Sequence, residues 1–236
     1  MTAMKFKFTI QDYQTEAVES VTRVFNGQPC RNMQSYLQDI REKTVDTDLF
    51  KGNLFEREYS LGYRNAPVEL DSSALLENIR TVQRYNNIRI SNALAKHMGC
   101  CSLDIEMETG TGKTYVYIKT MFELNKLYGW SKFIVVVPTI AIREGVKKSF
   151  ATMEDHFMEQ YGKKARFFVY DSKNLTDIDN FGSSADLSVM IINMQAFNTR
   201  RKDARRIRME LDQFGSRRPI DIIRDTHPII IQDEPQ

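Results

Sequence analysis

The sequence predicts an α/β fold in which a mainly parallel sheet lies between helices. Five apolar segments rich in β-branched residues follow one another from residue 100 onward, and helical stretches separate the first three. A glycine-rich stretch, METGTGKT at 107–114, stands between the first of these strand candidates and a helix. Strands that alternate with helices imply a parallel sheet covered on both faces.

The first predicted element is a helix within TIQDYQTEAVESVTRVF, residues 9–25. Helical spacing would place five apolar side chains on one face, namely Ile10, Tyr13, Ala17, Val21 and Val24. Thr9 is a candidate N-cap, with Asp12 three residues later. The following NGQPC, residues 26–30, ends the helix.

Residues 27–98 predict a mixed insertion rather than one regular element. The stretch 71–97, DSSALLENIRTVQRYNNIRISNALAKH, has a helical pattern. The stretch 50–70 is compatible either with short strands or with a loop. The corresponding domain division is a helix at 1–26, the insertion at 27–98 and a nucleotide-binding lobe at 99–236.

The strand and helix candidates of the lobe can be given as ranges. The strand candidates are 100–108, 133–138, 165–171, 187–197 and 227–234. The helices are expected at 113–128 and 139–160, and polar connections at 172–186 and 198–227, the second with helical pieces.

Composition excludes several classes of protein. The 236 residues are 42% hydrophobic and 27% charged, which is ordinary for a globular domain and argues against disorder. No apolar run approaches membrane-spanning length, and the start of the chain has no signal-peptide pattern, so a cytoplasmic protein without a membrane segment is expected. Three cysteines are too few and too unevenly spaced for a disulfide framework or a zinc site, which favours core or incidental thiols.

The motif at 107–114 predicts a phosphate-binding loop. Gly110 and Gly112 let the backbone turn its N–H groups inward, and the N-terminus of the next helix favours an anion. Lys113 can reach the β- and γ-phosphates of ATP, and the Thr114 hydroxyl can bind Mg²⁺. The predicted nucleotide-binding residues of the loop are Thr109, Gly110, Thr111, Gly112, Lys113 and Thr114. The common motif has glycine at the position of Met107, so this loop is a variant.

An acidic pair follows the last apolar segment. Asp233 and Glu234 come directly after PIIIQ, at the carboxyl end of a predicted strand, where open α/β sheets build their sites. With a phosphate loop in the same chain, Asp233 is predicted to hold Mg²⁺ and Glu234 to act as the base that polarises the attacking water. Without that loop, the pair would be interpreted as a solvated turn.

METGTGKT and DEPQ, residues 233–236, resemble motifs I and II of superfamily 2 helicases and translocases. Together with VVVPTIAIREGV at 135–146 and INMQAFN at 192–198, they resemble the Res subunit of type III restriction-modification enzymes. This resemblance implies a RecA-like P-loop NTPase lobe. It also implies a type III deoxyribonuclease that couples ATP hydrolysis to movement on duplex DNA, with a modification (methyltransferase) subunit as partner.

The resemblance also implies roles for single residues. Gln14, in DYQTEAV, would recognise adenine, although it could be an ordinary glutamine on a helix surface. Residues of the PTIAIREG corner and of NMQAF would contact DNA, namely Pro138, Thr139, Arg143, Asn193 and Gln195. Thr139 can equally serve as the N-cap of the next helix, and the NMQAF segment can equally be explained by packing.

A basic segment, NTRRKDARRIR at 198–208, carries six cations against one acid. Arg205 and Arg206 are its candidate contacts with DNA phosphates. Such contacts would give salt-dependent affinity without sequence preference. A solvated helix face is the alternative interpretation.

Two further functions stay open at this point: the first lobe of another superfamily 2 DNA or RNA helicase, and a non-catalytic nucleotide-binding module. The resemblance implies a second lobe and a nuclease domain beyond Gln236, so a longer parent protein is expected. The 236 residues alone are expected to hydrolyse ATP very slowly.

Overall fold

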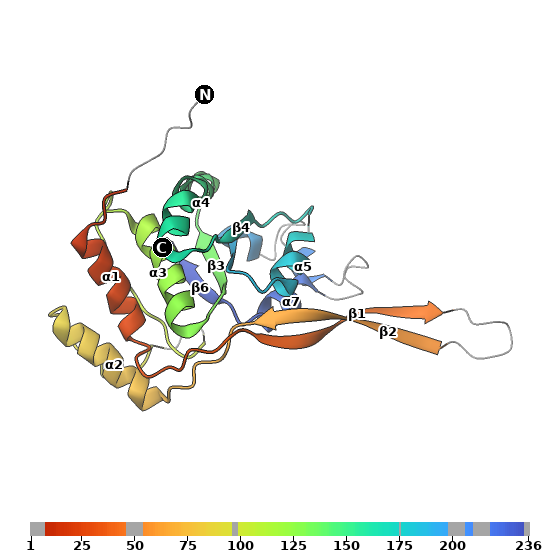
Figure 1. Ribbon diagram of the computed structural model, residues 1–236, viewed down its shortest axis with the longest axis horizontal. Coiled ribbons are helices and arrows are strands. Elements are labelled where there is room, and N and C mark those ends of the chain that lie inside the picture. The colour runs from red at the N-terminus through yellow and green to blue at the C-terminus, as the bar shows by residue number, and fades with distance from the viewer. Residues whose placement is uncertain are drawn as a thin grey trace, which may run out of the picture. The chain divides into compact units, whose positions relative to one another are not determined.

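The computed structural model describes residues 8–45, 54–95, 99–174, 176–197, 206–209 and 218–233 (Figure 1). The chain forms two compact units that are interleaved in sequence. The helical unit comprises Met1–Asn32, Ala66–Trp130 and Lys148–Lys164. The sheet unit comprises Met33–Asn65, Ser131–Lys147 and Ala165–Gln236. The predicted insertion at 27–98 is divided between these units, and the domain boundaries at 26 and 98 stay predictions.

The helical unit is built on α1, α2, α3 and the second part of α4. Their bounds are α1 Asp12–Arg23, α2 Ser72–Tyr85, α3 Lys113–Tyr128 and α4 Ile140–Tyr161. The helix predicted at 113–128 is therefore confirmed, and the one predicted at 139–160 is confirmed within one residue at each end. Helix α1 packs against both α2 and α3.

The predicted apolar face of α1 was only partly right: Val24 is buried, and Ala17 and Val21 are half-buried. Tyr13 and Ile10 are about half exposed, whereas Gln14, Val18 and Thr22 form the buried stripe. Polar side chains occupy this stripe because they have internal partners: the Gln14 amide donates to the Thr111 carbonyl, and the Thr22 hydroxyl donates to the Glu19 carbonyl at 3.2 Å. The predicted N-cap was also wrong, since Gln11 caps α1 without a side-chain hydrogen bond.

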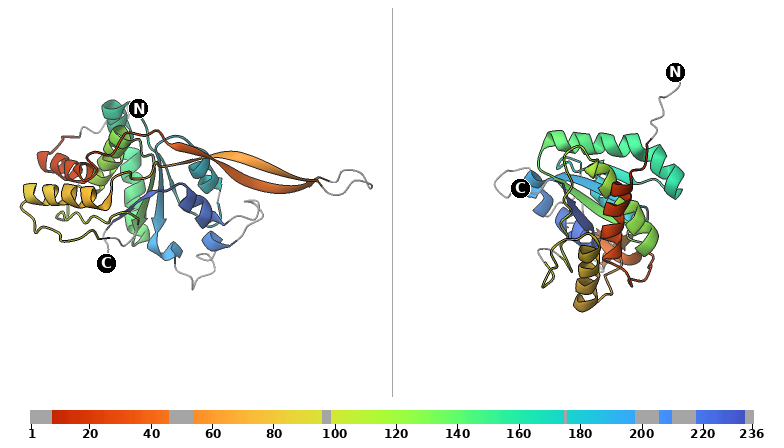
Figure 2. Two further views of the ribbon diagram at one scale, coloured as in Figure 1. Left: turned by 90° about the horizontal axis from the view of Figure 1, so that it is seen from below. Right: turned by 90° about the vertical axis from the view of Figure 1, so that its left-hand side faces the viewer.

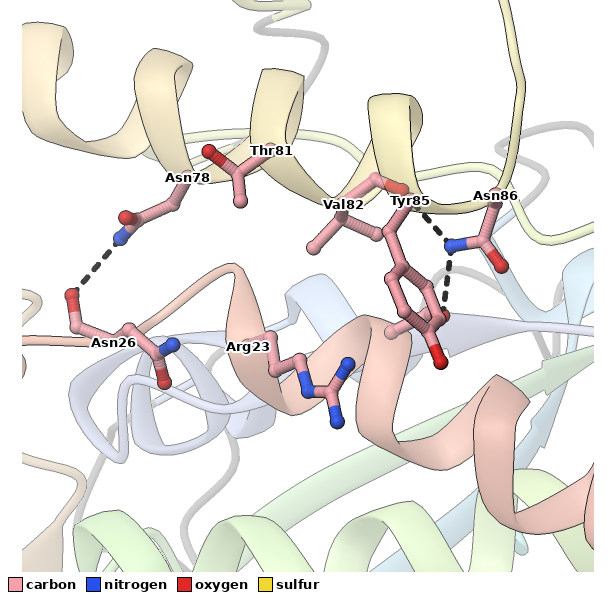
Figure 3. Close-up of a pocket in the computed structure, with 8 residues that line it drawn as sticks. Arg23, Asn26, Asn78, Thr81, Val82, Tyr85 and Asn86 are labelled. Atoms are coloured by element: carbon pink, nitrogen blue, oxygen red, sulfur yellow. Dashed lines mark hydrogen bonds between the residues drawn. The ribbon is translucent and has the colours of Figure 1, made fainter.

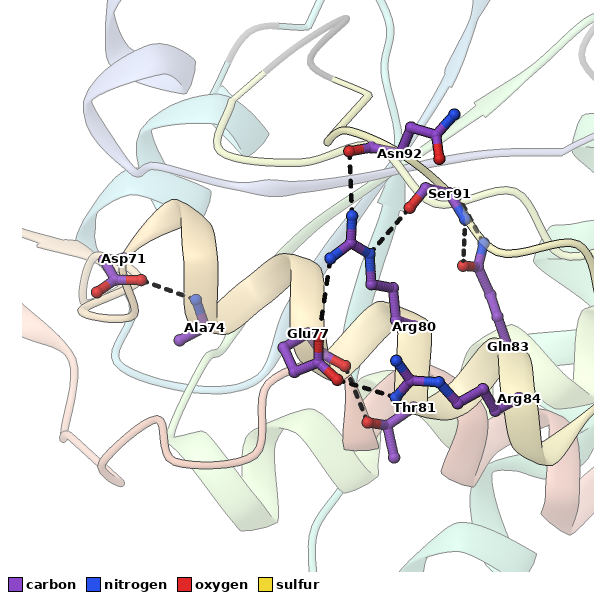
Figure 4. Close-up of polar contacts among 9 residues, drawn as sticks. All are labelled: Asp71, Ala74, Glu77, Arg80, Thr81, Gln83, Arg84, Ser91 and Asn92. Atoms are coloured by element: carbon purple, nitrogen blue, oxygen red, sulfur yellow. Dashed lines mark hydrogen bonds and ion pairs between the residues drawn. The ribbon is translucent and has the colours of Figure 1, made fainter.

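Helix α2 begins at a strong cap and ends earlier than predicted. The Asp71 carboxylate accepts from the backbone N–H groups of Ser73 and Ala74, which lowers its pKa (Figure 4). The helix ends at Tyr85 rather than continuing to 97, because Asn87 adopts a left-handed conformation that asparagine tolerates. Beyond that turn, Arg80 donates to the carbonyl of Ser91 and so holds the next segment to α2 (Figure 4).

The sheet unit contains four parallel strands in the order β4-β5-β3-β6. Their bounds are β3 Lys132–Val137, β4 Arg166–Val169, β5 Ser188–Asn193 and β6 Ile229–Gln232. These strands confirm four of the five predicted strands and the predicted parallel α/β sheet. The registers Val137↔Asn193 and Val136↔Gln232 bring the carboxyl ends of β3, β5 and β6 to one edge of the sheet.

The strand predicted at 100–108 is not formed. Residues 101–108 are irregular, and Asp104, Ile105 and Glu106 are exposed. An extended segment becomes a strand only when a neighbour accepts and donates its backbone hydrogen bonds. Alternating apolar and charged residues indicated an extended chain here, but could not supply that neighbour.

Three further helical segments belong to the sheet unit: α5 Thr176–Ser183, α7 Pro219–Asp225 and the short η2 Arg206–Arg208. Their apolar side chains cover one face of the sheet in a cluster around Ile134, Met190 and Ile192. Helix α5 replaces what was predicted as a polar connection, because Ile178 and Phe181 are buried beneath its charged surface. A short 3-10 turn, η1 Met194–Phe197, follows β5.

A long antiparallel hairpin completes the sheet unit (Figures 1 and 2). Strand β1 is Gln34–Val45 and β2 is Leu54–Arg64. Between these strands the register places Arg41 opposite Glu58, Glu42 opposite Arg57 and Lys43 opposite Glu56.

Lys132 is fully buried at the start of β3, and its ammonium donates to the carbonyls of Phe181 and Ser184 at the end of α5. Burial lowers the pKa of Lys132 to about 8, while the nearby Asp186 carboxylate partly counteracts the shift. A cation beside the last carbonyls of a helix satisfies groups that the helix itself leaves unpaired.

This buried lysine predicts a pH dependence of stability. Between pH 8 and 10.5 the unfolded chain keeps the Lys132 proton more than the folded chain does, so the free energy of unfolding should rise with pH. From pH 7 to 9.5 we expect a gain of about 2 kcal/mol relative to Lys132→Met, measured by urea unfolding of both proteins at each pH. Parallel pH profiles of the two proteins would contradict the assignment.

Candidate nucleotide-binding site

The phosphate loop lies in the helical unit and has the backbone geometry that the motif predicts. Gly110 and Gly112 have φ of +84° and +87°, and Gly112 is the N-cap of α3. The turn at 108–111 is closed by the Thr111 hydroxyl, which donates to the carbonyl of Glu108 at 2.6 Å. Helix α3 then begins at Lys113, with no acidic residue in its first turn. Its first N–H groups therefore form an anion site with no competing carboxylate of the same turn.

Helix α1 holds this loop from the side. The Gln14 amide nitrogen and the Tyr13 hydroxyl both donate to the carbonyl oxygen of Thr111, at 2.9 and 3.1 Å. Gln14 is buried, and its amide nitrogen also lies 2.6 Å from where a Cβ on Gly112 would stand. The residue that the sequence offered as the adenine reader is thus placed against the loop. The part played by Tyr13 was missed, because nothing in its local pattern separates a donor from a packing aromatic.

Polar contacts fix α3 to the neighbouring helices α1 and α4. The Lys119 ammonium donates to the Thr15 hydroxyl at 3.2 Å, which ties α3 to α1. The Tyr115 hydroxyl lies 3.1 Å from Nε2 of His156 on α4. Burial lowers the pKa of His156, and the charge of Lys119 adds to that effect while Glu159 opposes it. These contacts keep the helix N-terminus, and with it the loop, in one orientation.

Substitution of Gly112 tests this geometry. An alanine there would have to adopt φ near +87°, and its Cβ would displace Gln14 from the loop. The left-handed backbone alone costs about 1–2 kcal/mol. We expect Gly112→Ala to weaken binding of an ATP analogue, as measured by calorimetric titration. Gly145→Ala is the matched control, because no atom lies within 4 Å of its added Cβ and its φ is not positive. Equal affinity of both variants would contradict the arrangement.

The other predicted site residues of known position lie at the carboxyl edge of the sheet unit. Asp233 follows β6, and its N–H donates to the carbonyl of Val136 at 2.9 Å. Lys113 lies in the helical unit and Asp233 in the sheet unit, so their convergence stays a prediction. Glu234 and Arg205 lie outside the described residues, and only the backbone of Arg206 is described, at the start of η2.

The segment after β3 forms the start of α4. The Thr139 hydroxyl accepts from the N–H of Ile142 at 3.2 Å, which confirms its capping role. Pro138 precedes it, half-buried, and the Arg143 guanidinium pairs with the adjacent Glu144 at 2.9 Å. The cap uses only an acceptor position of the Thr139 hydroxyl. The O–H donor and the exposed side of the turn can therefore still contact DNA.

The segment after β5 shows one unusual group. Oδ1 of Asn193 is buried and has no hydrogen-bond partner among the described residues. Gln195, two residues later in η1, is exposed. A buried acceptor without a donor costs free energy, so Asn193 has a chemical reason to bind a donor from outside this segment.

A small pocket of about 110 Å³ lies elsewhere in the helical unit, between α1 and α2 (Figure 3). The Asn78 amide donates to the carbonyls of Val24 and Asn26, and the Asn86 amide donates to the Ser20 hydroxyl and the Val82 carbonyl. These amides hold α2 on α1 and do not converge on the phosphate loop.

The parallel sheet and the phosphate loop define a P-loop nucleotide-binding protein of the helicase type. The family model described as "Type III restriction enzyme, res subunit" matches residues 70–235. The chain belongs to this family.

Three curated relatives agree with this assignment. The Res subunit of the type III restriction-modification enzyme EcoP15I of Escherichia coli is 33% identical over 192 residues, which cover 72% of this chain and 19% of the relative. The EcoPI Res subunit of Escherichia phage P1 is 29% identical over 190 residues, with the same two shares. The StyLTI Res subunit of Salmonella typhimurium is 35% identical over 159 residues, or 57% of this chain and 15% of the relative. The chain thus spans about a fifth of the length of the relatives that it matches.

Among the residues that the structure describes, no helix combines the length and the apolar character needed to cross a membrane.

Proposed function

We propose that this chain is the ATP-binding motor lobe of a type III restriction enzyme's Res subunit. In the whole protein, this lobe would couple ATP hydrolysis to movement on duplex DNA before cleavage by a nuclease domain. The observation that carries the proposal is the loop Thr109–Thr114, with two left-handed glycines at the N-terminus of α3 and Gln14 bonded to its backbone. Family membership supports the same function.

The proposed roles follow from chemistry and from position. Lys113 would contact the β- and γ-phosphates, and the Thr114 hydroxyl with the Asp233 carboxylate would hold Mg²⁺. Glu234 would orient and deprotonate the attacking water. Magnesium bound with nucleotide needs only one or two protein oxygens besides phosphates and water, so a hydroxyl and a carboxylate are a sufficient set.

Gln14 is proposed to read adenine while it keeps its contact with the loop. A side-chain amide carries two N–H donors and one acceptor, so a bond to Thr111 leaves donor and acceptor capacity for a base edge. Adenine recognition would then be linked to the position of the phosphate loop, because both depend on the same side chain.

The proposed DNA-contacting residues are Pro138, Thr139, Arg143, Asn193, Gln195, Arg205 and Arg206. Those that lie at or shortly after the ends of β3 and β5 are on the carboxyl side of the sheet, and Arg205 and Arg206 belong to the basic segment at 198–208. The proposed partners are duplex DNA and the modification subunit that the type III systems of the relatives' names imply, in the cytoplasm. The proposed division is an adenine-reading helix at 1–26, an insertion at 27–98 and the motor lobe at 99–236.

The DNA part of the proposal is tested in the whole Res subunit by reversing two charges. Arg205→Glu with Arg206→Glu should weaken binding to unrelated duplexes equally, because phosphate contacts carry no sequence information. The slope of log affinity against log salt should fall by about two.

The matched control reverses two exposed lysines of the helical unit, Lys163 and Lys164, and should leave the salt slope unchanged. If both double variants bind DNA like the wild type, the basic segment is a solvated surface and its DNA role is refuted. Nucleotide binding at the loop would be unaffected by that result.

A further inference from the structure

Two adjacent cysteines, Cys100 and Cys101, lie in the irregular segment that leads into the phosphate loop. Their sulfur atoms are 3.9 Å apart, and neither forms a disulfide. Cys100 is exposed and Cys101 is half-buried, so reagents can reach the pair.

The arrangement of the two sulfurs is specific to this backbone. In an extended chain, successive side chains point to opposite sides, which separates neighbouring sulfurs. Here the chain bends at Gly99 and Cys100, with Gly99 at φ +72°, and the Ser102 N–H donates to the Ala95 carbonyl at 2.7 Å. The bend and this hydrogen bond together turn both thiols toward one another.

The sulfur separation suits a bridging soft atom better than a disulfide. A separation of 3.9 Å is close to van der Waals contact between two sulfurs, so one atom can bond both after small rotations of the two side chains. A disulfide needs sulfurs about 2.05 Å apart and Cα atoms about 4.4–6.8 Å apart, whereas neighbouring Cα atoms across a trans peptide are about 3.8 Å apart. A vicinal disulfide would therefore be strained and readily reduced.

The number of sulfurs restricts the ligand further. Within the described part of the chain, no group of three or more histidine, cysteine, aspartate or glutamate side chains could hold a metal ion. A structural zinc needs four ligands, so this pair does not make one. An arsenical with one organic group and trivalent arsenic needs only two thiolates to complete its coordination.

We propose that Cys100 and Cys101 form a two-sulfur binding site for thiophilic trivalent arsenicals. With phenylarsine oxide, two S–H bonds and the arsenic–oxygen double bond break and two As–S bonds form, and both thiol protons leave with the oxygen as one water molecule. Arsenic stays trivalent and sulfur stays at the thiol level, so the step needs no oxidant or reductant.

The environment of Cys101 slows its reaction with a reagent that alkylates a single thiol. The hydrogen bond from Cys100, and then burial, raise the pKa of the Cys101 thiol. A protonated thiol is a poor nucleophile toward a simple alkylating agent. Cys30, exposed and separate in sequence, supplies a single-thiol comparison within the same chain.

The test uses the 236-residue protein, phenylarsine oxide and intact-mass spectrometry. One arsenical per chain should survive an excess of a monothiol and should be released by dithiothreitol. Cys100→Ser and Cys101→Ser should each lose the monothiol-resistant adduct, and Cys30→Ser should keep it. Circular dichroism shows that each variant is folded. Removal of the wild-type adduct by monothiol, or its retention in either Cys100→Ser or Cys101→Ser, would overturn the site.

A second measurement separates a site set by the fold from mere adjacency in sequence. The dithiothreitol concentration that releases half of the adduct should be about tenfold or more higher for folded protein than for protein in urea, since the fold holds both sulfurs in place beforehand. Equal midpoints would show that the fold contributes nothing, and would refute the proposed preorganisation.

Discussion

Replacement of Lys113 by alanine is expected to weaken the binding of Mg·ATP by about tenfold to more than a hundredfold, with little change in stability. Lys113 is the first residue of α3, directly after the left-handed Gly112, so we expect its charge to face the phosphates. A hydrogen bond to a charged group contributes about 1.5–3 kcal/mol, and each 1.4 kcal/mol is a factor of ten in affinity. Its side chain is only partly buried, so its loss leaves no large cavity in the core.

The measurement is calorimetric titration with a non-hydrolysable ATP analogue, together with thermal unfolding. Lys126→Ala is the matched control, because Lys126 lies in the last turn of the same helix, mostly exposed, and pairs only loosely with Glu123. The control should keep the wild-type affinity. A large fall in melting temperature for Lys113→Ala would instead mean that Lys113 is structural, and unchanged affinity would refute its role at the phosphates.

Replacement of Asn65 by leucine is expected to lower the free energy of unfolding by about 3 kcal/mol or more. Asn65 is buried at the end of β2, where its amide makes four hydrogen bonds of 2.8–3.0 Å. Its oxygen accepts from the N–H groups of Ser131 and Lys132, and its nitrogen donates to the carbonyls of Lys132 and His227. This one side chain thus connects the starts of β3 and β6.

Leucine has a similar size but satisfies none of these groups, and each buried unpaired backbone group costs about 1–3 kcal/mol before relaxation. For a chain of this length, a loss of 3 kcal/mol lowers the melting temperature by roughly 6–12 °C. Asn180→Leu, on the exposed surface of α5 in the same unit, carries the same chemical change and should have little effect. Similar melting temperatures for both variants would show that the Asn65 amide is not a structural bridge.

The sequence predicted the elements whose cause is local. The helix at Lys113–Tyr128 and the loop before it follow from the glycine spacing, the helical pattern and the apolar strands around them. Strands β3 and β5 are buried along most of their length. Their continuous apolar runs therefore predicted strands without any knowledge of their neighbours. The family model matches residues 70–235, the stretch that contains this loop and these strands.

Tertiary structure decided which polar groups are inside. Gln14 is buried on α1, Lys132 is buried at the start of β3 with its ammonium at the end of α5, and Asn65 bridges two strands, although all three residue types are usually exposed. Their burial depends on carbonyl and N–H groups that lie far away in sequence, and a periodicity within one segment carries no information about those partners.

The same reason explains the strand that was predicted and not formed, and the hairpin that could not be distinguished from a loop. Whether residues 101–108 or 54–64 become strands depends on a second segment whose backbone faces them. A helix closes its hydrogen bonds within its own segment, so its sequence can specify it alone. A strand is completed by another part of the chain, and only the folded chain shows whether that part is present.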